Sequence, residues 1–85
     1  MQKLPSAPRY LEIDEEVVGV LSSVFADPEG GKLGIVVDNQ EYAIEFDTQE
    51  GLQNTRQSLL PLVNLLVNVL RVSSDELDAI SAEPI

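Results

Sequence analysis

Carboxylates are the side chains in this sequence that could do chemistry, because the chain contains no cysteine and no histidine. Carboxylate groups can hold calcium, hydrolyse a glycosidic bond as a pair, or stand in for the phosphates of a nucleic acid. None of the acidic groups has the spacing of a calcium-binding loop, and a chain of 85 residues has little room for a cleft between two carboxylates. We therefore expect no metal site, no cofactor and no enzymatic activity. The acidic groups are Glu12-Asp14-Glu15-Glu16, Glu41-Glu45-Asp47 and Asp75-Glu76-Asp78.

The charge balance restricts the class of partner. Fifteen acidic and five basic residues give a net charge of −10, which repels phosphate backbones and anionic membranes. The basic residues are scattered rather than clustered, so the sequence argues against direct binding to nucleic acid. A basic protein surface is the natural partner, because complementary fields speed encounter and discourage wrong pairings.

The chain predicts one small domain. Residues 1–9 contain two prolines and little hydrophobicity, which predicts a flexible N-terminal segment, and residues 10–85 are predicted to form a single globular domain. The N-terminus lacks the apolar run of a signal peptide. The longest apolar stretch, Leu59 to Leu70, is shorter than the roughly 20 residues that a membrane span needs. We expect a cytoplasmic protein.

Strands are the predicted elements of the first half. Glu16 to Phe25 is predicted as a strand, bent at Gly19, and Asp27 to Lys32 as a turn. Period-two alternation then predicts two more strands and an antiparallel meander. Their core face carries Leu33, Ile35, Val37, Tyr42, Ile44 and Phe46, and their solvent face carries Lys32, Val36, Asp38, Glu41, Ala43 and Glu45.

The second half allows two interpretations. In the first, the meander is followed by two or three helices, and Asn64, Asn68 and Arg71 form a helical stripe that faces water. In the second, a helix runs from Thr48 to about Val63 and ends at a left-handed Asn64. Leu65 to Val72 is then a fourth strand and the C-terminal residues a fifth. This predicts a small β-rich α+β fold, a five-stranded barrel with one helix between strands three and four.

Three segments of the sequence support the second interpretation. They are VVGVLSSVFADPEGGKLGIVVDNQEYAIEF, LLPLVNLLVNV and ELDAISAEPI. Together they resemble small bacterial OB-fold domains over Val17 to Ile85, which implies the five-stranded OB-like barrel. Such domains commonly have glycine where this chain has Asn64 and Arg71. The resemblance includes no functional motif and implies no binding residues.

The function expected from the sequence is that of a non-catalytic protein-interaction module, accessory subunit or inhibitor that docks a larger protein with a basic surface. It could act as a nucleic-acid mimic, and the same acidic surface could also be merely solubilising. An alternative is OB-type binding of single-stranded nucleic acid or saccharide, and self-association through Leu59–Val72 is a further interpretation of that apolar segment. The residues expected to contact the basic partner are Asp38, Glu41, Glu45 and Asp47, with Glu15 and Glu16 contributing.

Overall fold

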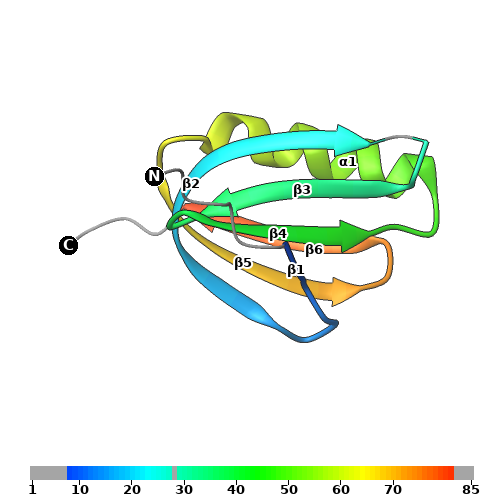
Figure 1. The fold of residues 1–85 in the computed structure, drawn as a ribbon, viewed down its shortest axis with the longest axis horizontal. Coiled ribbons are helices and arrows are strands. Elements are labelled where there is room, and N and C mark those ends of the chain that lie inside the picture. Colours follow the sequence, from blue (N-terminus) through cyan, green and yellow to red (C-terminus); the bar gives the residue numbers. More distant parts are fainter. Residues whose placement is uncertain (1–7, 28, 82–85) are drawn as a thin grey trace, which may run out of the picture.

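The computed structural model describes residues 8–27 and 29–81, which form one six-stranded mixed sheet and one α-helix (Figure 1). The sheet order is β1-β4-β3-β2-β5-β6, with β1 parallel to β4 and the other pairs antiparallel. Most of the predicted flexible segment, residues 1–7, lies outside the described residues. The elements are β1 (Arg9–Tyr10), β2 (Glu16–Asp27), β3 (Lys32–Val37), β4 (Gln40–Glu45), α1 (Gln49–Leu59), the 3-10 helix η1 (Leu60–Leu62), β5 (Leu66–Ser73) and β6 (Glu76–Ser81).

Strand β2 belongs to both halves of the sheet. Its first part pairs with β5, and its second part, from Leu21 onward, pairs with β3. At the start of the second part, between Leu21 and Ser23, the register with β3 shifts, which marks a β-bulge. Figure 1 shows the strand curving from β5 across to α1. The bend predicted at Gly19 therefore lies a few residues further along the chain.

The sheet is open, so the expected closed barrel is wrong. Strands β1 and β6 stand at its two ends and each pairs on one side only within the described residues. The physical reason lies in β1, whose two residues pair in parallel with Tyr42 and Ala43 and so occupy the edge of β4. The predicted antiparallel meander of β2, β3 and β4 is confirmed.

The apolar stretch after α1 is a strand, so the interpretation with a second and third α-helix is wrong. Thr48 caps α1 by accepting a hydrogen bond from the backbone N–H of Gly51, as an N-cap hydroxyl does. The α-helix ends at Leu59, and Pro61 lies in the 3-10 turn that follows. Asn64 then adopts a φ of 75°, which confirms its left-handed conformation. The residues beyond it extend into β5.

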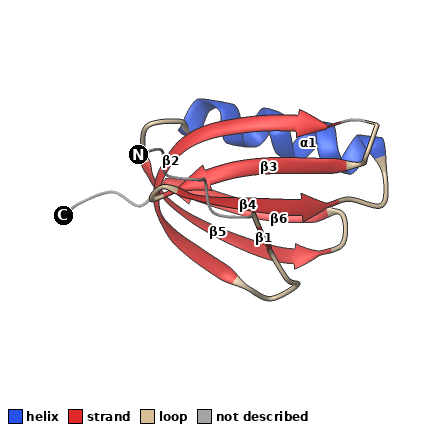
Figure 2. Cartoon of the chain, viewed as in Figure 1, coloured by secondary structure: helices blue, strands red, loops and turns tan. Residues whose placement is uncertain are grey.

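The core lies between the inner face of the sheet and α1. The helix buries Leu52, Thr55 and Leu59 and packs against β2, β3 and β6. Figure 2 shows it running along β2 and β3. Tyr42 and Phe46 are buried, as their positions in the alternation predict. The other core residues of the strands are Leu21, Leu33, Ile35, Val37, Ile44, Val67, Val69 and Leu77, and Leu11 joins them from the β1–β2 connection.

Arg71 carries a buried positive charge, with only 9% of the residue exposed. Its guanidinium donates to the backbone carbonyls of Leu11 (2.7 Å), Ser73 (3.3 Å), Ser74 (3.3 Å) and Glu45. No carboxylate of the described residues forms an ion pair with it. Carbonyl dipoles therefore satisfy this charge, and the guanidinium joins the β5–β6 turn to the end of β4 and to the chain after β1.

Asp75 makes a second connection at the same end of the molecule. Its carboxylate accepts from the backbone N–H groups of Asp47 (2.8 Å) and Thr48 (3.0 Å) and from the Thr48 hydroxyl (3.2 Å). These donors lie at the N-terminus of α1, where free N–H groups and the helix dipole favour a negative charge. Asp75 thereby fixes the start of the helix against the β5–β6 turn.

Replacing Arg71 with methionine, which keeps much of the volume, should lower the free energy of unfolding by about 3 kcal/mol, because buried carbonyls lose their donors. Urea denaturation followed by circular dichroism measures this loss. The control is Arg56→Met on α1, whose side chain has no hydrogen bond or ion pair within the described chain and should cost less than about 1 kcal/mol. Equal losses in the two variants would contradict the role assigned to Arg71.

Candidate binding surface

Two aromatic rings lie on the outer face of the sheet, away from the core. Tyr10 and Phe25 are each 46% exposed. The strand registers place Phe25 beside Gly34, Gly34 beside Ala43 and Ala43 beside Tyr10, in one row across β2, β3, β4 and β1. Adjacent strands are about 4.8 Å apart, so the two rings stand at the ends of a row whose middle positions have almost no side chain.

Gly34 provides the space that the Phe25 ring occupies. A Cβ built at this glycine would overlap Cε2 and Cζ of the ring. The ring therefore lies directly over the glycine backbone, which explains a glycine in the interior of a strand. Any side chain at this position would displace Phe25 from the sheet surface.

The rings line a groove of about 180 Å³ whose floor is formed by Gly34 and Ala43. Lys32 lines it as well, and its Nζ donates to the Tyr10 hydroxyl at 3.0 Å and lies 5.5 Å from the centre of that ring. The hydrogen bond to Tyr10, followed by the negative charges of Glu45 and Asp27, raises the pKa of Lys32. The hydrogen bond holds the ammonium at the Tyr10 side of the groove.

Glu41 and Glu45 are the two predicted contact residues that the structure brings to this surface. They stand on either side of Ala43 on the outer face of β4, in register with Val36 and Lys32 respectively. Asp27 also lines the groove. Neither glutamate carboxylate has a hydrogen bond or ion pair within the described residues, so both are free to meet a cation.

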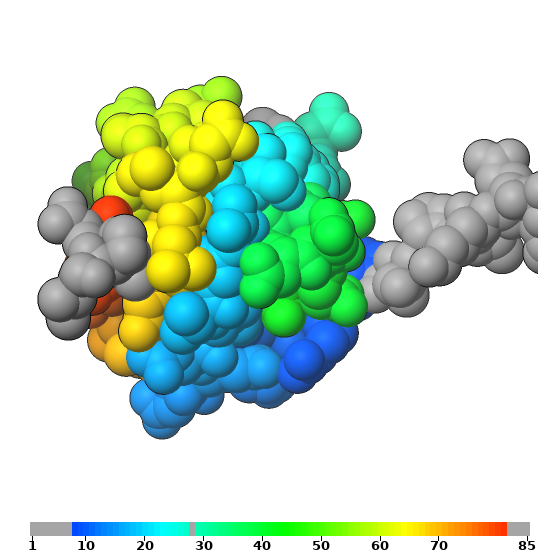
Figure 3. Space-filling view, turned by 90° about the vertical axis from the view of Figure 1, so that its left-hand side faces the viewer, coloured from blue at the N-terminus to red at the C-terminus, as the bar shows by residue number. Residues whose placement is uncertain are grey.

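Asp38 lies elsewhere and has a structural role. With φ values of 49° and 68°, Asp38 and Asn39 form the two-residue turn between β3 and β4, where left-handed residues match the twist of a hairpin. The Asp38 carboxylate accepts from the backbone N–H of Val20 at 2.8 Å and covers Gly19. Figure 3 faces this end of the molecule, with the hairpin in green beside β2 in blue and cyan.

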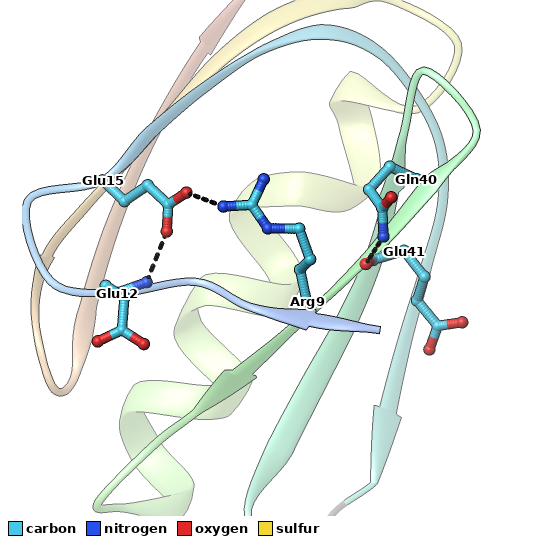
Figure 4. Close-up of polar contacts among 5 residues, drawn as sticks. All are labelled: Arg9, Glu12, Glu15, Gln40 and Glu41. Atoms are coloured by element: carbon cyan, nitrogen blue, oxygen red, sulfur yellow. Dashed lines mark hydrogen bonds and ion pairs between the residues drawn. The ribbon is translucent and has the colours of Figure 1, made fainter. Parts of the chain in front are cut away.

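The remaining predicted residues are outside the groove. Glu15 forms an ion pair with Arg9 (2.8 Å) and accepts from the backbone N–H of Glu12 (3.0 Å), and in Figure 4 the Glu41 carboxylate points away from this pair. Glu16 opens β2 opposite Leu70. Asp47 follows β4 and is attached through its backbone to Asp75. The six predicted residues therefore do not form one continuous surface.

The sequence pattern does not single out Phe25, because strict alternation from Leu21 would place it on the core face. The bulge in β2 inserts one residue between Leu21 and Ser23, which moves every later side chain to the opposite face. Val24 and Ala26 consequently pack against the core and Phe25 is turned outward. The one signal in the sequence is Gly34, since a glycine inside a strand indicates close approach of another group.

The apolar segment Leu59–Val72 is divided between core and surface. Leu59, Val67 and Val69 are fully buried, whereas Leu65 and Leu66 are exposed. A second group of exposed apolar side chains lies on the outer face where the first part of β2 pairs with β5 and β5 pairs with β6. This group is separate from the row of Phe25 and Tyr10, which crosses the other half of the sheet. It comprises Val18, Val20, Leu66 and Ile80.

The chain matches no protein-family model, no curated protein and no solved structure. Among residues 8–27 and 29–81, no three metal-ligating side chains come together in a way that could hold an ion. Within the same residues, no helix has the length and hydrophobicity to cross a bilayer.

The dependence of Phe25 on Gly34 can be measured with a double-mutant cycle. Gly34→Ala should lower the free energy of unfolding by about 1 to 2 kcal/mol, because the methyl group displaces the ring. In a Phe25→Ala background the same substitution should be neutral or stabilising, since alanine restricts the unfolded chain and no ring opposes it. Additive effects in urea denaturation would show that the ring and the glycine are not coupled.

Proposed function

We propose that this protein is a non-catalytic interaction module, acting as an accessory subunit or inhibitor, and that it docks a basic partner protein through the outer face of β3 and β4. The observation that carries the proposal is the pair of free carboxylates, Glu41 and Glu45, on the same face as the exposed rings of Tyr10 and Phe25. This surface offers both a negative charge and apolar contact area.

A basic protein segment suits both properties. Lysine and arginine side chains place their aliphatic stems on apolar surface while their charged ends stay near water or a carboxylate. The net charge of −10 adds a long-range attraction that steers such a partner toward the domain. Lys32 opposes this attraction only in part, because the nearby negative charges of Asp27 and Glu45 offset its positive charge.

The OB-like relationship of the five longer strands is part of the proposal. It is supported by β2, which pairs with both β3 and β5, and by the place of α1 between β4 and β5 along the chain. In OB-folds the ligand face is formed by the second and third strands. The corresponding strands here are β3 and β4, which form the floor of the groove.

A second candidate function is OB-type binding of a saccharide or single-stranded nucleic acid. The exposed rings of Tyr10 and Phe25 favour it, because both ligand classes bind by stacking on aromatic side chains. The carboxylates of Asp27, Glu41 and Glu45 oppose phosphates but not a neutral sugar. Self-association through Leu59–Val72 is a separate proposal, supported by the exposed Leu65 and Leu66.

The proposed function predicts charge-dependent binding of a fluorescein-labelled peptide of alternating basic and serine residues. Its affinity, measured by fluorescence anisotropy, should fall at least tenfold between about 50 and about 500 mM salt, because salt screens exposed charges. Glu41→Gln with Glu45→Gln should reduce the low-salt affinity by about tenfold, at roughly 0.7 kcal/mol for each lost charge pair.

The matched control is Glu12→Gln with Glu76→Gln, which removes the same number of charges from exposed positions outside the groove. This control should retain most of the affinity. Peptide binding that is indifferent to salt, or equally weakened in both double variants, would contradict docking at this surface. Tighter binding of a labelled single-stranded oligonucleotide or oligosaccharide than of the peptide would favour the second candidate.

A further inference from the structure

We propose that the groove takes one arginine side chain of the partner, with the guanidinium above Ala43, between the rings of Phe25 and Tyr10, and with its charge paired to Glu41. This inference rests on the proposed function, because it assumes that the partner is basic. It goes further by assigning one side-chain type to one position on the surface.

The shape of the groove supports a single inserted side chain. The Phe25 ring lies over Gly34, and at the neighbouring Ala43 nothing projects beyond one Cβ. The rings of Phe25 and Tyr10 on either side of Ala43 are each nearly half exposed. The volume of about 180 Å³ accommodates one long side chain rather than a folded element. The Phe25 ring is kept in place over Gly34, so this wall exists before any partner arrives.

The charged side chains around Ala43 determine at which end of the groove a partner cation would bind. Lys32 and Glu45 are paired on β3 and β4, two residues along the strands from the pair Gly34 and Ala43 and on the same face. The Lys32 ammonium donates to the Tyr10 hydroxyl. Glu41 lies two residues from Ala43 in the opposite direction along β4, on the same face of the sheet. Glu41 lines the groove, and its carboxylate has no hydrogen bond or ion pair within the described residues. On the Lys32 side, the carboxylates of Asp27 and Glu45 already face a cation. The Glu41 carboxylate has no such partner among the described residues, so a partner cation is attracted to the Glu41 side.

Arginine fits this arrangement better than lysine. A guanidinium is planar, is more weakly hydrated than an ammonium, and stacks on aromatic faces while it donates two hydrogen bonds to one carboxylate. An ammonium on a flexible stem gains less from the two rings. A groove with aromatic walls and an unpaired Glu41 carboxylate consequently discriminates between the two basic side chains.

The test compares two labelled peptides of equal length and charge at low salt, one with only arginine and one with only lysine as its basic residue. The arginine peptide should bind about tenfold more tightly in fluorescence anisotropy. Ala43→Leu fills the space between the rings without changing any charge, so it should reduce the affinity for arginine to that for lysine. The control, Val18→Leu, enlarges an exposed strand side chain outside the groove by one methylene without changing any charge, and it should preserve the preference.

Phe25→Ala provides a second variant if Ala43→Leu disturbs folding, and it should also abolish the preference, because the stacking wall is lost. Equal affinities of the two peptides, or a preference that survives in these variants, would overturn the inference. Salt-dependent binding of both peptides would in that case leave the proposed function standing. Absence of binding by either peptide at low salt would overturn both.

Discussion

The hydrogen bonds of the buried Arg71 guanidinium are the interaction on which the arrangement of the binding surface depends. Through the carbonyls of Leu11 and Glu45 they connect the β5–β6 turn to the chain directly after Tyr10 and to the last residue of β4. The first of these places adjoins Tyr10, which lines the groove, and the second ends the strand that contributes Glu41 and Ala43 to it. Because a buried charge without partners is very costly, the acceptor carbonyls must stay together, and the short β1 is thereby held on the edge of β4.

The same constraint accounts for the open sheet. A strand of two residues has few hydrogen bonds of its own, and β1 stays paired because Leu11, which follows it, is buried and its carbonyl accepts from Arg71. Tyr10 then projects on the outer face next to Ala43. The buried Arg71 guanidinium thus helps to position the exposed Tyr10 ring, because it binds the backbone of the next residue, Leu11.

Much of the fold could be predicted from the sequence, because alternation along β3 and β4 and the capping residue of α1 are local signals. The stretch after Asn64 was ambiguous, since Asn64, Asn68 and Arg71 have the spacing of a helical stripe. Its strand conformation depends on long-range pairing with β2 and β6 and on the burial of Arg71. The parallel pairing of β1 likewise arises from contacts between distant parts of the chain.

The binding surface was predictable only in part. Alternation places Glu41 and Glu45 on the outer face, but it does not show that the Asp38 carboxylate is used by the backbone of Val20 or that Glu15 is paired with Arg9. The bulge that turns Phe25 outward is also invisible in an alternating pattern. Acidic residues that look alike in the sequence therefore divide into those that maintain the fold and those left free for a partner.

The most direct test is a map of amide chemical shifts in ¹⁵N-labelled protein titrated with an arginine-rich peptide. The largest changes should lie around the groove, at Phe25, Gly34, Glu41 and Ala43, and they should disappear at high salt. Changes centred instead on Val18, Leu66 and Ile80 would contradict it, because those residues form a separate apolar surface on β2, β5 and β6.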